Sequence, residues 1–180
     1  MPKVAKEKNE ALIQLQDKLN IKNINAVPKI EKIIVACWIW SLVTRKWQKD
    51  FEEFEKVLKK ITWQKARMIK SKKAISNFKL REWLPVMLQV TLRKKRAYDF
   101  LDRFVKLVLP RVRDFTWISS KSFDPSWILN VGIPNYNIFP ELNLDDVTIP
   151  MGVQITIVTT GKDTEQSKAL LQSLWCVFKL

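Results

Sequence analysis

The sequence predicts an α+β fold in which helices pack against a single, mostly antiparallel sheet. Hydrophobic residues alternate with a period of two in some segments and recur at helical spacing in others. These segments follow one another as strand, helix, strand, strand, helix, strand, strand, helix, which is typical of an α+β domain. The 180 residues, 47% of them hydrophobic, suffice for a folded core. We expect one domain over 1–180, with an N-terminal helix at about 5–20 and an α+β body at about 28–180.

The N-terminal elements are predicted from hydrophobic periodicity. They are a helix at 5–20, a strand at 29–37 that enters the core, an amphipathic helix within 46–62 and a short strand at 66–71. The inward stripe of the second helix comprises Phe51, Phe54, Val57, Leu58 and Ile61.

A long basic loop follows the second predicted strand, at residues 72–85, and long connections in compact domains are usually functional. The later elements are a strand at 86–94, a helix within 95–112 that stops at Pro110, a loop at 111–127, strands at 128–133 and 153–160, and a helix within 162–175. The inward residues of the first of these helices are Tyr98, Leu101, Phe104, Val105 and Val108. Asp163 or Thr164 can cap the last helix.

Positive charge is the strongest global signal. Lysine and arginine number 32 against 18 acids, for a net charge of +14. The excess is concentrated between residues 65 and 96, where eleven basic residues accompany one acid, Glu82. A solvated surface normally mixes both signs, so this tract predicts a polyanionic partner, and nucleic acid is the obvious one. The basic residues are Lys65, Arg67, Lys70, Lys72, Lys73, Lys79, Arg81, Arg93, Lys94, Lys95 and Arg96.

The residues that most enzymes need are missing. The chain has no histidine and only three glycines, and it contains no glycine-rich nucleotide-binding motif and no nucleophile elbow. The acidic cluster at 50–55 is helix-spaced, as expected for a polar helix face. Cys37 and Cys176 lie in apolar surroundings without a metal-binding spacing, and we expect buried free thiols. We expect no catalytic site, metal or cofactor.

The sequence also lacks the features of a membrane protein or a secreted one. Its longest nearly apolar run, at 33–43, is shorter than the ~20 residues of a membrane helix. No secretory signal is visible at the N-terminus. We therefore expect a cytoplasmic protein without a membrane partner.

A composite motif resembles a known family. Residues 78–124, "FKLREWLPVMLQVTLRKKRAYDFLDRFVKLVLPRVRDFTWISSKSFD", are similar to the signature region of ribosomal large-subunit protein five in its bacterial form. The flanking segments "VPKIEKIIV", "IFPELNLDDV" and "GVQITIVTT" agree, and the resemblance covers about residues 5–180. It implies a ribosome-bound, non-enzymatic protein that binds 5S rRNA and large-subunit rRNA in the central protuberance. The further implied partners are P-site tRNA, a small-subunit head protein and other proteins of the central protuberance.

The resemblance and the charge pattern together define two groups of candidate residues. Gln64 and Thr91 are carried over from the family as rRNA contacts, whereas Ala36 replaces an asparagine of the family and puts one contact in doubt. The complete predicted rRNA-binding set is Gln64, Lys65, Thr91, Arg93, Lys94, Arg111 and Arg113. The residues predicted to contact tRNA from the long basic loop are Lys70, Lys72, Lys73, Ser76, Asn77, Phe78, Lys79 and Arg81.

Two alternatives stay open. A free-standing RNA chaperone or regulatory RNA-binding protein could reuse this fold, and it would bind any structured RNA equally well. For single lysines of the loop, a solvated side chain is an equally good interpretation, and residues 93–96 could instead cover the edge of the core with their stems.

The tryptophans depart from the family pattern. The chain has 8 tryptophans and 3 glycines, where average usage predicts about 13 glycines. All but Trp47 fall where the family has glycine, and Trp47 lies in a loop where glycine would be natural. One hypothesis is that the gene uses UGA as a glycine codon and that it is read here as tryptophan. The competing one is a tryptophan-rich platform for RNA.

Overall fold

The computed structural model describes residues 15–16, 18–19, 21–45, 51–113, 118–119, 122–142, 151–174 and 176. Most of the predicted N-terminal helix lies outside these residues. Of its described part, Leu15, Gln16 and Lys18 are helical, and Leu15 is buried. Trp47, Trp117 and Trp175 are also outside the described residues.

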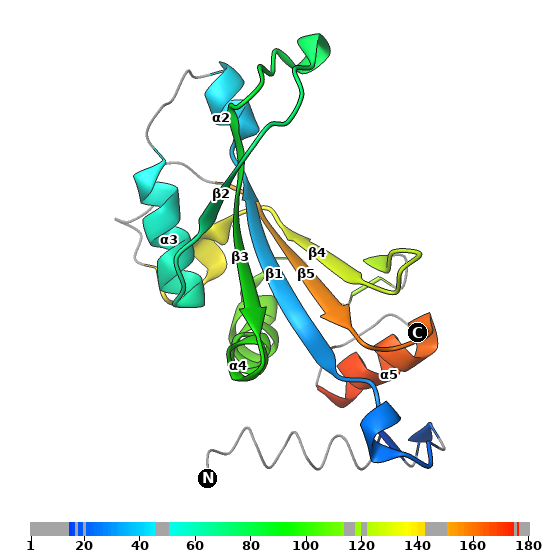
Figure 1. The fold of residues 1–180 in the computed structure, drawn as a ribbon. Helices are drawn as coiled ribbons and strands as arrows, with labels where there is room; N and C mark the ends of the chain where they lie inside the picture. Colours follow the sequence, from blue (N-terminus) through cyan, green and yellow to red (C-terminus); the bar gives the residue numbers. More distant parts are fainter. Residues whose placement is uncertain are drawn as a thin grey trace. The chain divides into compact units, whose positions relative to one another are not determined.

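Five strands form one open antiparallel sheet, which confirms the predicted fold class. The strand order is β2-β3-β1-β5-β4 (Figure 1), so β2 and β4 are the edges. β2 pairs antiparallel with β3, with Arg67 opposite Gln89 and Lys70 opposite Pro85. The bounds are β1 Ile30–Trp38, β2 Arg67–Lys70, β3 Pro85–Arg93, β4 Leu129–Ile133 and β5 Val153–Thr159.

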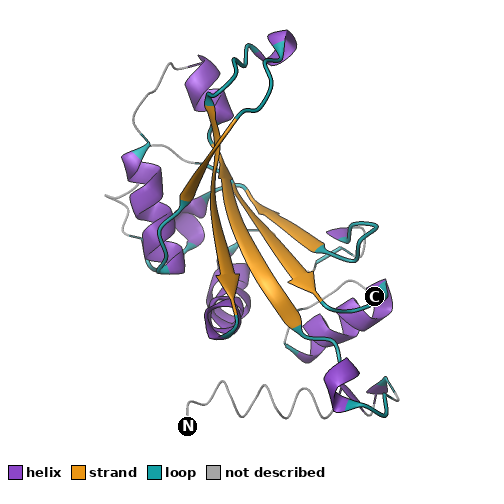
Figure 2. Cartoon of the chain, in the orientation of Figure 1, coloured by secondary structure: helices purple, strands orange, loops and turns teal. Residues whose placement is uncertain are grey.

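Four α-helices lie in the described part of the chain, together with several short 3₁₀ turns (Figure 2). The predicted stripe of the amphipathic helix is confirmed, since all five of its residues are buried. That helix begins with three glutamates in its first turn, where the helix dipole favours negative charge. The helix bounds are α2 Trp40–Arg45, α3 Glu52–Thr62, α4 Lys95–Arg103 and α5 Thr164–Ser173.

The helix predicted to stop at Pro110 has a different course. Its α-helical part ends at Arg103, a π-helical turn follows at Phe104–Val108, and a 3₁₀ turn at Leu109–Arg111 contains Pro110. Proline fits there because the first residues of a helical turn do not need their N–H groups. The wider π turn also changes which side chains face inward. Of the predicted inward residues, Val105 is only half-buried.

The predicted cap of the last helix is placed correctly but bonds differently. Asp163 is the N-cap residue of α5, yet its side chain makes no capping hydrogen bond. Instead Gln166 Oε1 accepts a hydrogen bond from the Lys162 backbone N–H at 3.2 Å. Helix α2 was not predicted, because its residues continue the apolar run of the strand before it.

The chain divides into two compact units, and β1, β3, β4 and β5 each contribute residues to both. The first comprises residues 1–33, 92–131 and 156–180, and the second comprises 34–91 and 132–155. In the first, the rings of Phe100 and Phe104 stack with centroids 6.2 Å apart, beside other buried residues such as Leu92, Leu129 and Ile157. The buried residues of the second unit include Val35, Ile39, Phe54, Leu58, Ile61, Leu88, Tyr136 and Ile155.

Candidate RNA-binding surface

The basic loop, predicted at residues 72–85, is a folded hairpin that spans residues 71–84. At its base, Ser71 donates its N–H to the Leu84 carbonyl at 2.8 Å, and Trp83 donates to the Ser71 carbonyl at 3.0 Å. Nearer the tip, Ile75 and Leu80 exchange two backbone hydrogen bonds of 2.9 and 3.1 Å. These bonds satisfy the backbone internally and leave the side chains available to a partner.

The side chains of the basic loop are displayed to solvent. Every residue from Lys72 to Lys79 is exposed, and so are Arg81 and Lys70, which ends β2. The tip also presents apolar groups, since Ile75 is 44% exposed and Phe78 is 56% exposed. The hairpin therefore brings seven of the eight residues predicted to contact tRNA onto one projecting element, and the eighth, Lys70, ends the strand that leads into it (Figure 1).

An aromatic contact connects the basic loop to α2. The ring of Phe78 meets the ring of Trp40 edge to face, with centroids 5.8 Å apart and an interplanar angle of 68°. Sequence reasoning placed Phe78 among the residues that follow RNA. The structure adds a packing role for this side chain, although more than half of it stays exposed.

Gln64 and Thr91, the two residues carried over from the family, are in contact. Gln64 Nε2 donates to the Thr91 carbonyl at 3.2 Å, so the amide lies against β3. Both residues are half-buried, and Lys65 beside them is exposed. The Thr62 hydroxyl donates to the Leu58 carbonyl at 2.6 Å and accepts a hydrogen bond from the Gln64 N–H at 3.4 Å, which stabilises the turn that carries Gln64.

The remaining predicted rRNA contacts lie in the other compact unit. Arg93 ends β3, and Lys94 follows it as the N-cap residue of α4. Arg111 ends the 3₁₀ turn after α4, and Arg113 lies two residues beyond. All four of these side chains are exposed. The structure therefore divides the predicted rRNA set between its two units.

The whole basic tract is exposed to solvent. All eleven of its lysines and arginines, from Lys65 to Arg96, are in the exposed class. The alternative that residues 93–96 cover the edge of the core with their stems stays a prediction, because a side chain that lies on the core can still keep its charged end in water. A dense and exposed positive tract fits a partner that supplies many negative charges.

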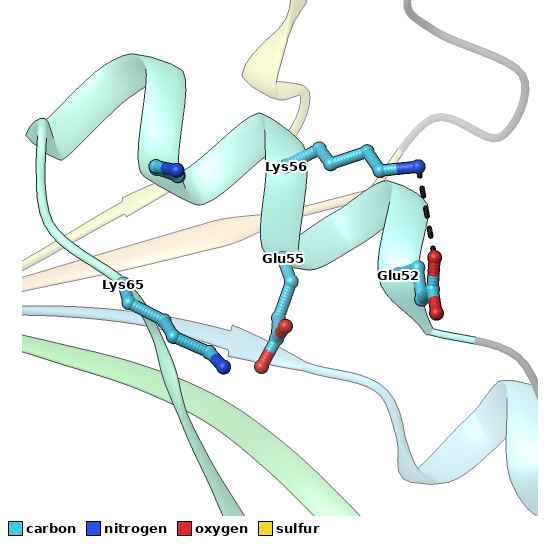
Figure 3. A pocket seen from close by; sticks show the side chains of 5 residues that line it. Glu52, Glu55, Lys56 and Lys65 are labelled. Carbon is cyan, nitrogen blue, oxygen red and sulfur yellow. Dashed lines mark ion pairs between the residues drawn. The ribbon is translucent and has the colours of Figure 1, made fainter.

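A shallow hollow of about 250 Å³ lies against α3, and charged residues of both signs line it. Lys56 Nζ lies 3.7 Å from Glu52 Oε2, and the side chains of Lys65 and Glu55 point toward one another (Figure 3). The hollow places Lys56 and Lys59 near Lys65, and neither of these two lysines was among the predicted RNA contacts. Because opposite charges alternate here, the hollow has neither the focused charge nor the apolar walls of a typical ligand site.

Cys37 and Cys176 are buried free thiols, as predicted, and burial raises the pKa of each to about 12. Among the described residues, no group of three or more cysteines and carboxylates could hold a metal ion. None of the described helices combines the length and the apolar character needed to cross a membrane.

Comparison with known proteins gives near full-length matches. A family model described as ribosomal protein L5 matches residues 23–81, and a second one, described as the C-terminus of that ribosomal family, matches residues 85–178. The chain is 41% identical over 171 residues to the large ribosomal subunit protein uL5 of Trichlorobacter lovleyi, which covers 95% of this chain and 94% of that one. It is also 41% identical over 179 residues to the protein of the same name from Clostridium botulinum, with 99% and 98% covered. Gln64 lies in the first matched range and Thr91 in the second.

Proposed function

The chain belongs to the ribosomal protein L5 family, and on that premise we propose that it binds 5S rRNA in the central protuberance of the large ribosomal subunit. Membership of the family makes it a structural, rRNA-binding constituent of that subunit and not an enzyme. The finer proposal adds P-site tRNA as the partner of the basic loop, and a small-subunit head protein and neighbouring central-protuberance proteins as further partners. The observation that carries the proposal is the exposure of all eleven basic residues between Lys65 and Arg96.

The side chains of this surface suit the backbone of a folded RNA. Lysine and arginine neutralise phosphates without reading sequence, and each contact releases counterions. Ser76 and Asn77 at the tip of the basic loop supply small hydrogen-bonding groups that can follow phosphates and 2′-hydroxyls. We propose that the protein recognises the shape of the RNA. We also propose that the whole chain acts as one RNA-binding domain.

Two separate contact regions are supported by the register of the β2–β3 ladder. Arg67 is paired with Gln89 at one end of this ladder, and Lys70 with Pro85 at the other. Gln64 and Thr91 lie beyond the first end, while the basic loop extends beyond the second (Figure 1). We therefore assign 5S rRNA to the region of Gln64 and Thr91, and tRNA to the basic loop.

The test is a pair of charge-matched triple variants. Lys72→Ala/Lys73→Ala/Lys79→Ala should leave 5S rRNA binding within about twofold but weaken tRNA binding about tenfold or more, because only the tRNA loses phosphate contacts. The control, Lys65→Ala/Arg93→Ala/Lys94→Ala, removes the same charge and should mainly weaken 5S rRNA binding. Filter binding at one fixed salt concentration measures both. Equal losses for both RNAs in the two variants would contradict the division into two regions.

A free-standing RNA chaperone is the competing function. It predicts equal affinity for 5S rRNA and for an unrelated structured RNA of the same length, whereas the ribosomal function predicts a clear preference for 5S rRNA. Sedimentation of cell extracts gives an independent answer. The protein should migrate with large subunits, and its absence from them would contradict the proposal.

A further inference from the structure

Tryptophan occupies backbone positions that normally require glycine. Five described residues other than glycine have positive φ, and three of them are Trp63, Trp83 and Trp127, at 55°, 65° and 59°. The left-handed region is uncommon for any residue with a Cβ, and a bulky residue there is an outlier. None of the described glycines has positive φ. In the described residues, tryptophan therefore occupies the left-handed region that glycine usually occupies, and glycine does not.

Trp63 lies where a glycine commonly ends a helix. It follows the last residue of α3 with φ 55° and ψ 24°, and its N–H donates to the Lys59 carbonyl at 2.8 Å. This is the left-handed C-cap, in which glycine is favoured because it lacks a Cβ. The side chain of Trp63 is 64% exposed, so burial of the indole does little to offset the strain.

Trp83 and Trp127 share a second backbone device, the β-bulge that begins with a left-handed residue. Trp83 donates to the Ser71 carbonyl while the Ser71 N–H bonds to the next residue, Leu84. Trp127 does the same at Asp124, at 2.8 Å, while the Asp124 N–H bonds to Ile128 at 2.9 Å. The first residue of such a bulge is normally glycine.

The two bulges differ in how far they expose their tryptophans. The side chains of Trp83 and Trp127 are 72% and 39% exposed. A large aromatic group that is selected for stability is mostly buried, and Trp83, at 72% exposed, contributes little packing to its hairpin, whereas Trp127 buries more than half of its surface. The left-handed backbone gains nothing from tryptophan at either position, and at position 83 the exposed side chain gains little either.

We propose that positions 63, 83 and 127 are glycine in the protein that its own cells make, because those cells translate the codon UGA as glycine. UGA differs by one base from the glycine codon GGA and by one base from the tryptophan codon UGG. If UGA is instead translated as tryptophan, the resulting sequence has a tryptophan at each position where a UGA codon specifies glycine. The left-handed tryptophans at one helix cap and at two β-bulges then have a single cause. The shortage of glycine, 3 residues against 8 tryptophans, has the same cause.

The assignment affects the candidate RNA-binding surface. Position 63 adjoins Gln64 and Lys65, and position 83 lies at the base of the basic loop. Glycine at both would remove two exposed indoles and let a phosphate approach the backbone closely. The interpretation of the tryptophans as a stacking platform for bases then does not apply at these sites.

Two measurements test the proposal. Peptide mass spectrometry of the protein from its own cells should find glycine at positions 63, 83 and 127, and tryptophan at any of them overturns the assignment there. Urea unfolding of the chain with tryptophan provides the second measurement. Trp63→Gly, Trp83→Gly and Trp127→Gly should each favour folding about tenfold over the matched alanine variants, because both changes remove the indole but only glycine lacks the Cβ. Alanine variants as stable as the glycine variants would overturn the structural premise.

Discussion

At the scale of single residues, burial determines the chemistry of the two thiols. Cys37 belongs to β1 and Cys176 follows α5, and both are almost fully buried. Removal from water disfavours the thiolate, which raises the pKa of each thiol from 9.0 to about 12. The thiolate is the reactive form, so both cysteines should be inert in the folded protein.

This burial predicts slow alkylation. At pH 8, a thiol with a pKa near 12 holds about a thousandfold less thiolate than one with the ordinary value of 9.0. Iodoacetamide should leave the native protein unmodified and label both cysteines in urea, with Cys37→Ser as the control that retains one site. The unfolded thiols ionise near pH 9 and the native ones near pH 12, so the free energy of unfolding should fall as pH rises through this interval. Rapid labelling of the native protein would contradict the burial.

At the scale of elements, hydrogen bonds between segments distant in the sequence fix where strands and helices begin and end. The Ile30 N–H at the start of β1 donates to the hydroxyl oxygen of Tyr98 on α4 at 3.2 Å, in a buried setting. In the second unit, the Ile39 N–H donates to the Val86 carbonyl at 2.9 Å, directly before α2 begins. The apolar run from Ile33 thus ends its strand pairing at Ile39 and turns into a helix.

Removal of the Tyr98 hydroxyl should have a measurable cost. In Tyr98→Phe the ring still packs, but the buried Ile30 N–H loses its acceptor, at a cost of about 1–2 kcal/mol in the free energy of unfolding. Urea denaturation measures the change. Tyr98→Leu, which also removes the ring, should cost more, and an unchanged midpoint for Tyr98→Phe would show that the hydrogen bond contributes nothing.

At the scale of the whole molecule, the net charge of +14 opposes compactness and favours a polyanion. The acids are partly occupied with helix termini and surface ion pairs, such as Asp102 with Lys106 at 2.6 Å. The basic tract from Lys65 to Arg96 therefore keeps a large excess of positive charge. RNA binding by such a protein must depend strongly on salt.

The salt dependence can be stated as a slope. If about half of the basic tract contacts phosphates, the logarithm of the 5S rRNA association constant should fall against the logarithm of salt concentration with a slope of about −4 to −5. Fluorescence anisotropy over a salt series measures it. The charge-matched triple variants should differ from one another, with the shallower slope for Lys65→Ala/Arg93→Ala/Lys94→Ala. A slope near zero would rule out phosphate neutralisation as the source of affinity.

The order of elements, the amphipathic stripe of α3 and the basic tract were all predictable from sequence. Each depends on local periodicity or composition, which neighbouring residues set without reference to the rest of the chain. The π turn after Arg103 and the helix α2 were missed, because both depend on how an apolar segment packs once the sheet exists. The individual RNA contacts stay predictions.

The sequence alone determined that this chain forms an α+β domain with a concentrated positive surface, because hydrophobic periodicity and charge are properties of the chain itself. Only the tertiary structure decided that Gln64 meets Thr91, that the basic loop is a hairpin, and that Trp63, Trp83 and Trp127 are left-handed. These features arise from hydrogen bonds between residues that the fold brings together. A bulge or a cap imposes its backbone angle whatever side chain it carries, and for this reason the left-handed backbone of these three tryptophans became visible only in the structure.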